Sequence, residues 1–220
     1  MSTDRAEAPG PQVQALLSEK QQPQLEEAAR LALSSREALD EILGGIVSRD
    51  EVYRYNCFQV LYRLSQDQPE ALYPEWDHLA GLLNSDNSYH RSIAGQLIPN
   101  LVQADAENRF EVGFDRIFAL LDDEKIVPAR QFAQHIGAIV RARPDLQPKI
   151  IERMLAVEDT HHTESRKDLL KGDVIAAFDE FFDESPEQER ILGFVERQLN
   201  CSSPRTRKVA QAFLKAHGTS

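Results

Sequence analysis

The segment RSIAGQLIPNL, residues 91–101, sets a pattern that returns along the whole chain. Counting from Arg91, an apolar residue stands three, six, seven and ten positions later. These residues are Ala94, Leu97, Ile98 and Leu101. Spacings of three and four residues place side chains on one face of an α-helix, so the segment predicts an amphipathic helix with one buried stripe.

Four other segments follow the same pattern, and the five anchors are separated by 37, 39, 41 and 36 residues. The segments are RYNCFQVLYRL (54–64), RQFAQHIGAIV (130–140), KGDVIAAFDEF (171–181) and RKVAQAFLKAH (207–217). The first position of each stripe is small or medium in size, which lets neighbouring helices approach closely. Gly137 is the weak member, because it offers no side chain to the stripe. Self-similarity at a fixed period indicates a repeat array.

A second amphipathic segment precedes each of these helices. Prolines stand near the start of three of them, at Pro69, Pro144 and Pro186, where a missing N–H costs nothing. Pro74 lies deeper, and we expect it to bend its helix. The sequence therefore predicts helix pairs at about 36–68, 69–105, 106–143, 144–185 and 186–217.

The beginning of the chain differs from the repeats. Residues 1–22 are rich in Gln, Pro, Ser and charge, and we predict a flexible N-terminal arm there. A weak helical pattern at Val13, Leu16 and Leu17 suits contact with the first repeat. A helix near 24–33 is expected to cap the array, and residues 23–220 are expected to form a single repeat domain.

Composition limits the partners and the compartment. The chain has 220 residues, of which 25 are basic and 36 acidic, giving a net charge of −11. This charge argues against nucleic acid as a partner, because binding to phosphates normally needs a basic surface. No apolar stretch is long enough to cross a membrane. The two cysteines, Cys57 and Cys201, form no metal-ligand motif, and a cytoplasmic location is expected.

At the level of its repeats, the chain resembles the HEAT-repeat, armadillo-like family. The resemblance rests on second helices that open with an arginine, as in Tyr89-His90-Arg91 and Pro128-Ala129-Arg130, and on an acid in the preceding turn. It implies an all-α fold, a right-handed α-α superhelix (solenoid) of about five helix pairs with an N-terminal capping helix. It also implies a structural ladder of hydrogen bonds between repeats, made by Arg54, Arg91 and Arg130 with turn acids such as Asp50, Asp86 and Asp123. The fourth pair departs from the pattern, because it has Lys171 in place of the arginine.

In such solenoids the second helices usually line the concave surface. Residues that flank the apolar stripes are expected to face outward there, where aromatic and amide side chains can hold a peptide. The candidate partner-binding residues are Tyr55, Gln59, Tyr62, Arg63, Ile93, Gln96, Asn100, Phe132, His135 and Arg141.

The sequence assigns no catalytic residue, no cofactor and no metal site. The segment 158–164 holds the strongest metal-like cluster, with His161 and His162 as weak candidate ligands. A solvated loop between helices is the alternative reading of this segment. None of the six histidines is followed by glutamate, unlike the repeated His-Glu pairs of dimetal hydroxylases with this architecture.

The main functional prediction is a non-catalytic scaffold that binds a protein or peptide through its concave face. The alternative is an enzyme or a lyase-like accessory protein on the same kind of scaffold, including a remote relative of DNA-repair glycosylases or chromophore lyases. That alternative predicts a tight cluster of titratable groups in one pocket. The sequence names no partner, pathway or oligomeric state.

Overall fold

The computed structural model describes residues 12–19 and 23–218 of the chain. Within these ranges the chain forms α-helices and short 3-10 helices, and no strand occurs there. The prediction of an all-α repeat fold is confirmed. The chain divides into two compact units, Met1–Leu72 and Tyr73–Ser220, where we expected a single domain over 23–220. Among the described helices, none has the length and apolar character needed to span a bilayer.

Five α-helices lie among the described residues of the first unit, 12–19 and 23–72. Their bounds are α1 (Gln12–Leu17), α2 (Leu25–Ser34), α3 (Arg36–Gly45), α4 (Glu51–Asp67) and α5 (Pro69–Leu72). Helix α1 agrees with the weak helical pattern at Val13 and Leu17. Helix α2 agrees with the predicted capping helix near 24–33.

Helix α1 corrects the prediction of a flexible arm over residues 1–22. Val13 and Leu17 are buried, so this short helix contributes to the apolar core of its unit. The buried side chain of Asn56 also donates hydrogen bonds to the carbonyls of Leu17 (2.8 Å) and Glu19 (3.2 Å). Residues 12–19 are therefore a folded part of the unit, whereas residues 1–11 and 20–22 lie outside the described residues.

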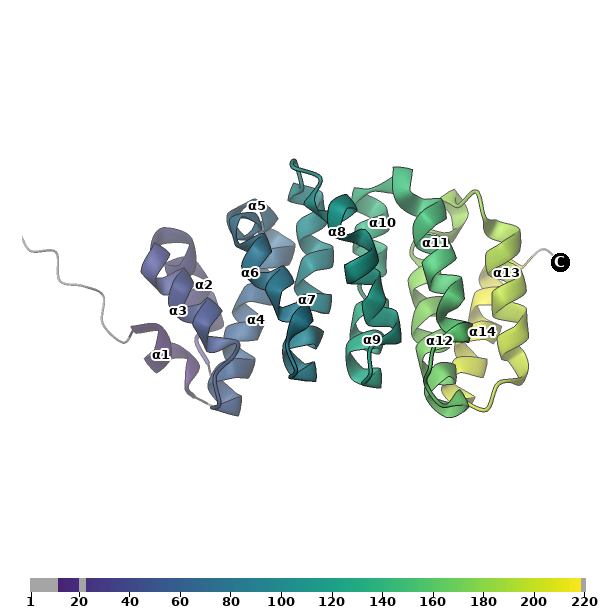
Figure 1. Cartoon of the computed structure of the whole chain (residues 1–220), viewed down its shortest axis with the longest axis horizontal. Coiled ribbons are helices and arrows are strands. Elements are labelled where there is room, and N and C mark those ends of the chain that lie inside the picture. Colours follow the sequence, from purple (N-terminus) through teal and green to yellow (C-terminus); the bar gives the residue numbers. More distant parts are fainter. Residues whose placement is uncertain (1–11, 20–22, 219–220) are drawn as a thin grey trace, which may run out of the picture. The chain divides into compact units, whose positions relative to one another are not determined.

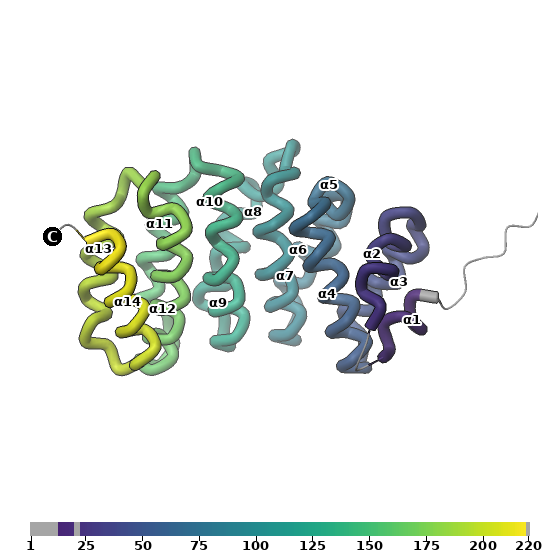
Figure 2. The backbone as a smooth tube through the Cα atoms, turned by 180° about the vertical axis from the view of Figure 1, so that it is seen from behind, coloured from purple at the N-terminus to yellow at the C-terminus, as the bar shows by residue number. Residues whose placement is uncertain are grey.

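The second unit holds the remaining four helix pairs. Its α-helices are α6 (Trp76–Gly81), α7 (Ser88–Leu101), α8 (Arg109–Phe118), α9 (Ile126–Ala133), α10 (Ile136–Ala142), α11 (Gln147–Leu155), α12 (Glu164–Asp179), α13 (Gln188–Arg197) and α14 (Pro204–His217). Figures 1 and 2 show two layers in this unit, with α6, α8, α11 and α13 in one and α7, α9–α10, α12 and α14 in the other. Neighbouring second helices pack side by side, α7 on α9, α9 on α12 and α12 on α14.

Helix starts follow the polar residues of the turns. Asp50 accepts hydrogen bonds from the backbone N–H groups of Val52 and Tyr53, and Asn87 and Ser203 cap α7 and α14 in the same way. In the second pair, the expected first helix is interrupted by a 3-10 turn at Tyr73–Glu75, which contains Pro74. The missing N–H of proline explains this break.

The repeated apolar stripe is buried on the second helices α4, α7, α9–α10 and α12, whereas on α14 Ala210 and Phe213 are buried and Leu214 is half-buried. In α7 the residues Ala94, Leu97, Ile98 and Leu101 have no exposed surface, as the pattern predicted. A small residue beside the stripe also allows close approach between α12 and α14. There, a Cβ placed on Gly172 would lie 2.5 Å from the hydroxyl oxygen of Thr206 and 3.4 Å from its Cα.

The second helix of the third pair is split, where the sequence predicted one helix. Helix α9 ends at Ala133 and α10 begins at Ile136. Gly137, the weak member of the stripe, lies under the carboxylate of Glu180, which directly follows α12, and a Cβ there would force that carboxylate to shift. The same carboxylate bonds Arg141, so glycine here makes space for an ion pair between two repeats.

Arginines at the anchor position hold the turns before their helices. Arg54, Arg91 and Arg207 each donate to the carbonyl six residues earlier, at 2.7–2.8 Å. Arg91 also reaches the next pair, because its Nε and one terminal nitrogen lie 2.6 and 2.9 Å from the two carboxylate oxygens of Asp123. Both side chains are buried, which makes this two-point contact a rigid polar link between repeats.

Arg130 makes its inter-repeat contact differently, because its acid is on the next helix rather than in a turn. Its guanidinium binds Asp173 of α12, whose side chain is fully buried. Gln134 and Arg205 donate to the same carboxylate, each at 3.0 Å. Asp173 thus joins α9, α12 and α14 through three donors, which compensates for the burial of its charge.

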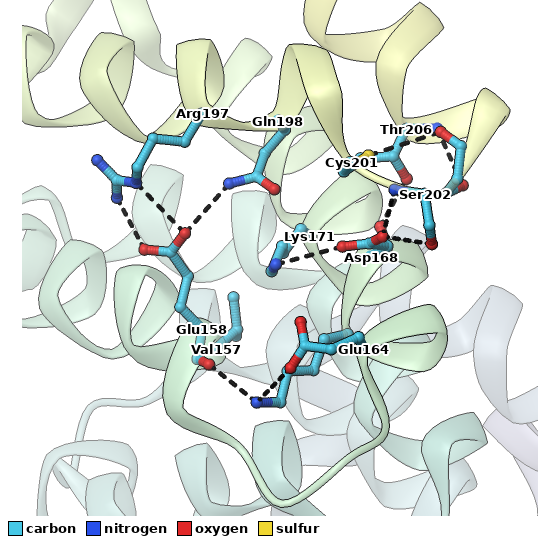
Figure 3. Close-up of polar contacts among 12 residues, drawn as sticks. Val157, Glu158, Glu164, Asp168, Lys171, Arg197, Gln198, Cys201, Ser202 and Thr206 are labelled. Carbon is cyan, nitrogen blue, oxygen red and sulfur yellow. Dashed lines mark hydrogen bonds and ion pairs between the residues drawn. The ribbon is translucent and has the colours of Figure 1, made fainter.

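Where Lys171 replaces the arginine, a different polar network links the last two pairs (Figure 3). Lys171 lies 3.3 Å from Asp168, and that carboxylate accepts from the backbone N–H (2.7 Å) and the hydroxyl (2.6 Å) of Ser202. Burial works to raise the pKa of Asp168, yet these donors hold it below its usual value. Glu158 accepts from Arg197 and Gln198 on the neighbouring pair.

Removal of Asp123 should destabilise the second unit. In Asp123→Ala, the buried guanidinium of Arg91 loses its two-point partner, although Glu124 at 3.2 Å remains. We expect a loss of about 2–3 kcal/mol in the free energy of unfolding, measured by urea denaturation followed by circular dichroism. Asp115→Ala removes the acid of an exposed pair with Arg153, 3.9 Å apart, and should cost less than about 0.5 kcal/mol. Equal effects would show that the Arg91–Asp123 link contributes no special stability.

Close approach of α12 and α14 gives a second prediction. Gly172→Ala should lower stability by about 1–3 kcal/mol, because the buried Thr206 and its backbone must move. Gly113→Ala in α8 meets only the end of Ile117, at 3.5 Å, and should be neutral or stabilise by up to about 1 kcal/mol. Thermal unfolding of both variants compares them directly, and a stabilised Gly172→Ala would contradict the packing described above.

Candidate functional site

Three of the predicted partner-binding residues do not face outward. Ile93 and Phe132 are at most 1% exposed, and Asn100 is also buried. The ring of Phe132 packs edge-on against Phe118, 5.2 Å between centroids, within the core of the second unit. The prediction of an accessible surface is therefore wrong for these three residues. An α-helix that is packed on several sides buries more than one stripe, which the single-stripe pattern underestimates.

The four predicted residues of the first unit lie on α4 with different surroundings. Tyr55 is 54% exposed, whereas Gln59 and Tyr62 are half-buried. The ring of Tyr62 lies 5.7 Å from that of Phe58, and burial raises the pKa of its phenol. Arg63 is exposed and forms ion pairs with Glu26 on α2 (3.1 Å) and with Asp67 on its own helix (3.4 Å). Tyr55 is thus the accessible aromatic residue among them.

In the second unit, Gln96, His135 and Arg141 remain at least partly accessible. Gln96 donates to the carbonyl of Ser92 at 3.1 Å, one turn earlier in α7. His135 stands at the break between α9 and α10, and its Nδ1 lies 2.6 Å from the carbonyl oxygen of Gln131. Burial lowers the pKa of His135, so its neutral form is favoured.

A row of polar contacts crosses the second helices from α9 to α14. Gln134, directly after α9, and Arg205 on α14 both reach Asp173, and Arg141 on α10 binds Glu180, directly after α12. We call the exposed residues of this row, Gln134, Arg141, Glu180 and Arg205, the second-helix face. This face offers hydrogen-bond donors, hydrogen-bond acceptors, and both positive and negative charges on three adjacent second helices. Such groups can bind the backbone and the side chains of a partner chain.

His161 and His162 do not point apart, as adjacent histidines on a helix would. They lie in the loop before α12, with ring centroids 4.3 Å apart. Asp122, at the end of the 3-10 turn Ala119–Asp122 after α8, joins them. One of its oxygens lies 2.6 Å from Nδ1 of His161 and accepts a hydrogen bond from the backbone N–H of that residue at 2.9 Å. One ligand atom from each of Asp122, His161 and His162 falls within 4.8 Å of the others.

His162 has an unusual position in this group. It is only 5% exposed, and its Nε2 is buried without a hydrogen-bond partner. Burial, followed by the neighbouring His161, lowers the pKa of its imidazole. A neutral ring with an unpaired buried nitrogen is an available ligand or hydrogen-bonding group.

Sequence analysis did not single out Asp122 as a site residue, although the repeat period offers an indirect signal for it. Asp122 and His161 are 39 positions apart, and so are Arg141 and Glu180. Counting 39 positions forward from a residue near the end of a helix therefore identifies its contact in the next repeat. A cavity of about 450 Å³ is lined in part by Asp122 and Thr160, but neither His161 nor His162 lines it.

No family model matches the chain, and no curated protein matches it either. Among solved structures, a designed armadillo repeat protein is similar to it with a TM-score of 0.55 and 18% identity, over 93% of this chain and 97% of that one. An engineered protein gives a TM-score of 0.44 at 16% identity, over 92% and 93% of the two chains. The first likeness is one of fold, and it shows that this chain has an armadillo/HEAT-like helical repeat fold.

Proposed function

We propose that this protein is an interaction scaffold that binds a segment of another protein along the second-helix face of its second unit. The observation that carries the proposal is the row of accessible polar groups on Gln134, Arg141, Glu180 and Arg205, which three adjacent second-layer elements hold at fixed spacing. We include a cytoplasmic location in the proposal, in keeping with two free cysteines.

The rigidity of the face supports this proposal. Asp173, fully buried beneath Gln134 and Arg205, fixes the positions of both donors before a partner arrives. Groups that are already ordered lose less conformational entropy on binding. The mixture of Arg141 and Glu180 suits a partner segment that carries both charges or free backbone groups rather than a polyanion.

The test compares two double variants that remove equivalent ion pairs from opposite layers. Arg141→Ala with Glu180→Ala removes a pair between α10 and α12 on the second-helix face. Arg153→Ala with Asp115→Ala removes a pair between α11 and α8 in the other layer. Each variant loses one cation and one anion, so the net charge of the chain does not change. Tagged wild-type protein and both variants would capture proteins from the native lysate, with identification by mass spectrometry.

We expect a partner that the wild type captures to be lost, by about tenfold or more, with the Arg141/Glu180 variant alone. Cross-linking of the purified pair should then place the partner on α9, α10, α12 or α14. Equal capture by all three proteins, or a partner lost only with the Arg153/Asp115 variant, would overturn the assignment to this face.

A further inference from the structure

The group formed by Asp122, His161 and His162 is separate from the second-helix face. Asp122 follows α8 of the first layer, and both histidines lie in the loop between α11 and α12. The loop is held in place by Thr160, which is buried and donates to the carbonyl of Val157 at 2.9 Å. Two neighbouring helix pairs therefore bring these three residues together.

We propose that Asp122, His161 and His162 bind a divalent zinc ion that joins the third and fourth helix pairs. Two imidazole nitrogens and one carboxylate oxygen form a usual ligand set for Zn²⁺, and three protein ligands leave a fourth position for water. The ligand atoms already lie within 4.8 Å of one another.

The buried Nε2 of His162 is the observation that separates this group from an ordinary surface cluster. A buried polar atom without a partner is costly, and it calls for a hydrogen-bonding group, a water or an ion. The nearby Asp123 is paired with Arg91, whereas Asp122 contacts His161, another member of this group.

Binding requires a small adjustment of the two outer residues. Ligand atoms about 2.0–2.1 Å from a tetrahedral zinc ion lie about 3.3 Å from each other. The 2.6 Å contact between His161 Nδ1 and Asp122 must therefore lengthen, and His161 must carry its proton on Nε2. Both side chains are about half exposed, at 51% and 53%, so they can turn without disturbing the core.

Another histidine in the chain provides a matched control. His217 contacts Asp179 through Nε2 (2.7 Å) and Asp183 through Nδ1 (3.2 Å). The two carboxylates lie on opposite nitrogens of one ring, so they cannot hold one ion together with it. His217→Gln removes a histidine with acidic neighbours but should leave zinc binding unchanged.

The experiment titrates the metal-free full chain with zinc chloride and measures binding by isothermal calorimetry. Four proteins are compared: wild type, Asp122→Asn, His162→Gln and His217→Gln. We expect one ion per wild-type chain, and affinity lower by about 100-fold or more in the first two variants, because each loses one of three ligands. Co²⁺ in place of zinc should give the strong visible absorption of a four-coordinate site, and that absorption should disappear with Asp122→Asn.

Asp122 is half exposed, so Asp122→Asn tests the site even if His162→Gln does not fold. Absence of saturable one-to-one binding to the wild type would overturn the proposal. So would wild-type affinity in Asp122→Asn, since the ion would then lie elsewhere. Loss of affinity in His217→Gln to the same extent would also overturn it, because the effect would not depend on this group.

Discussion

The fold depends on a constraint that each helix pair shares: its apolar stripe is buried only when a neighbouring pair covers it. In α7 the four stripe residues are completely buried, and α9 packs beside that helix. Small residues set the distance, as Gly172 does where α12 meets Thr206 of α14. Repeat proteins are stabilised by such nearest-neighbour interfaces, and each interface also determines which polar groups can meet.

Polar groups at these interfaces are buried with the apolar ones, and they are satisfied across the repeat boundary. Asp123 receives Arg91, while Asp173 receives donors from the helices on both of its sides. A buried charge adds little net stability to a protein, but it penalises any arrangement that leaves it unpaired. These pairs therefore fix the register between neighbouring helices more than they raise the total stability.

Much of this fold can be read from the sequence, because it follows from a repeating apolar pattern. The five pairs and the stripes were predicted closely, and Arg91 has the neighbour that the family resemblance implies. The pattern says less about local exceptions. It gave no sign that Gly137 makes room for Glu180, or that the helix breaks beside His135. It also placed Phe132 on a surface, because one stripe cannot describe a helix covered on more than one side. Asp122 was missed because its partners are distant in sequence and close only after the pairs stack.

The spacing of the inter-repeat contacts has a kinetic consequence. Arg91 and Asp123 are 32 positions apart, Asp122 and His161 are 39 apart, and Arg130 and Asp173 are 43 apart. Contacts of this range close loops of only one repeat, so their entropic cost stays nearly constant along the array. Folding of the second unit can accordingly begin in any adjacent pair of repeats and spread to its neighbours, without waiting for the two ends of the chain to meet.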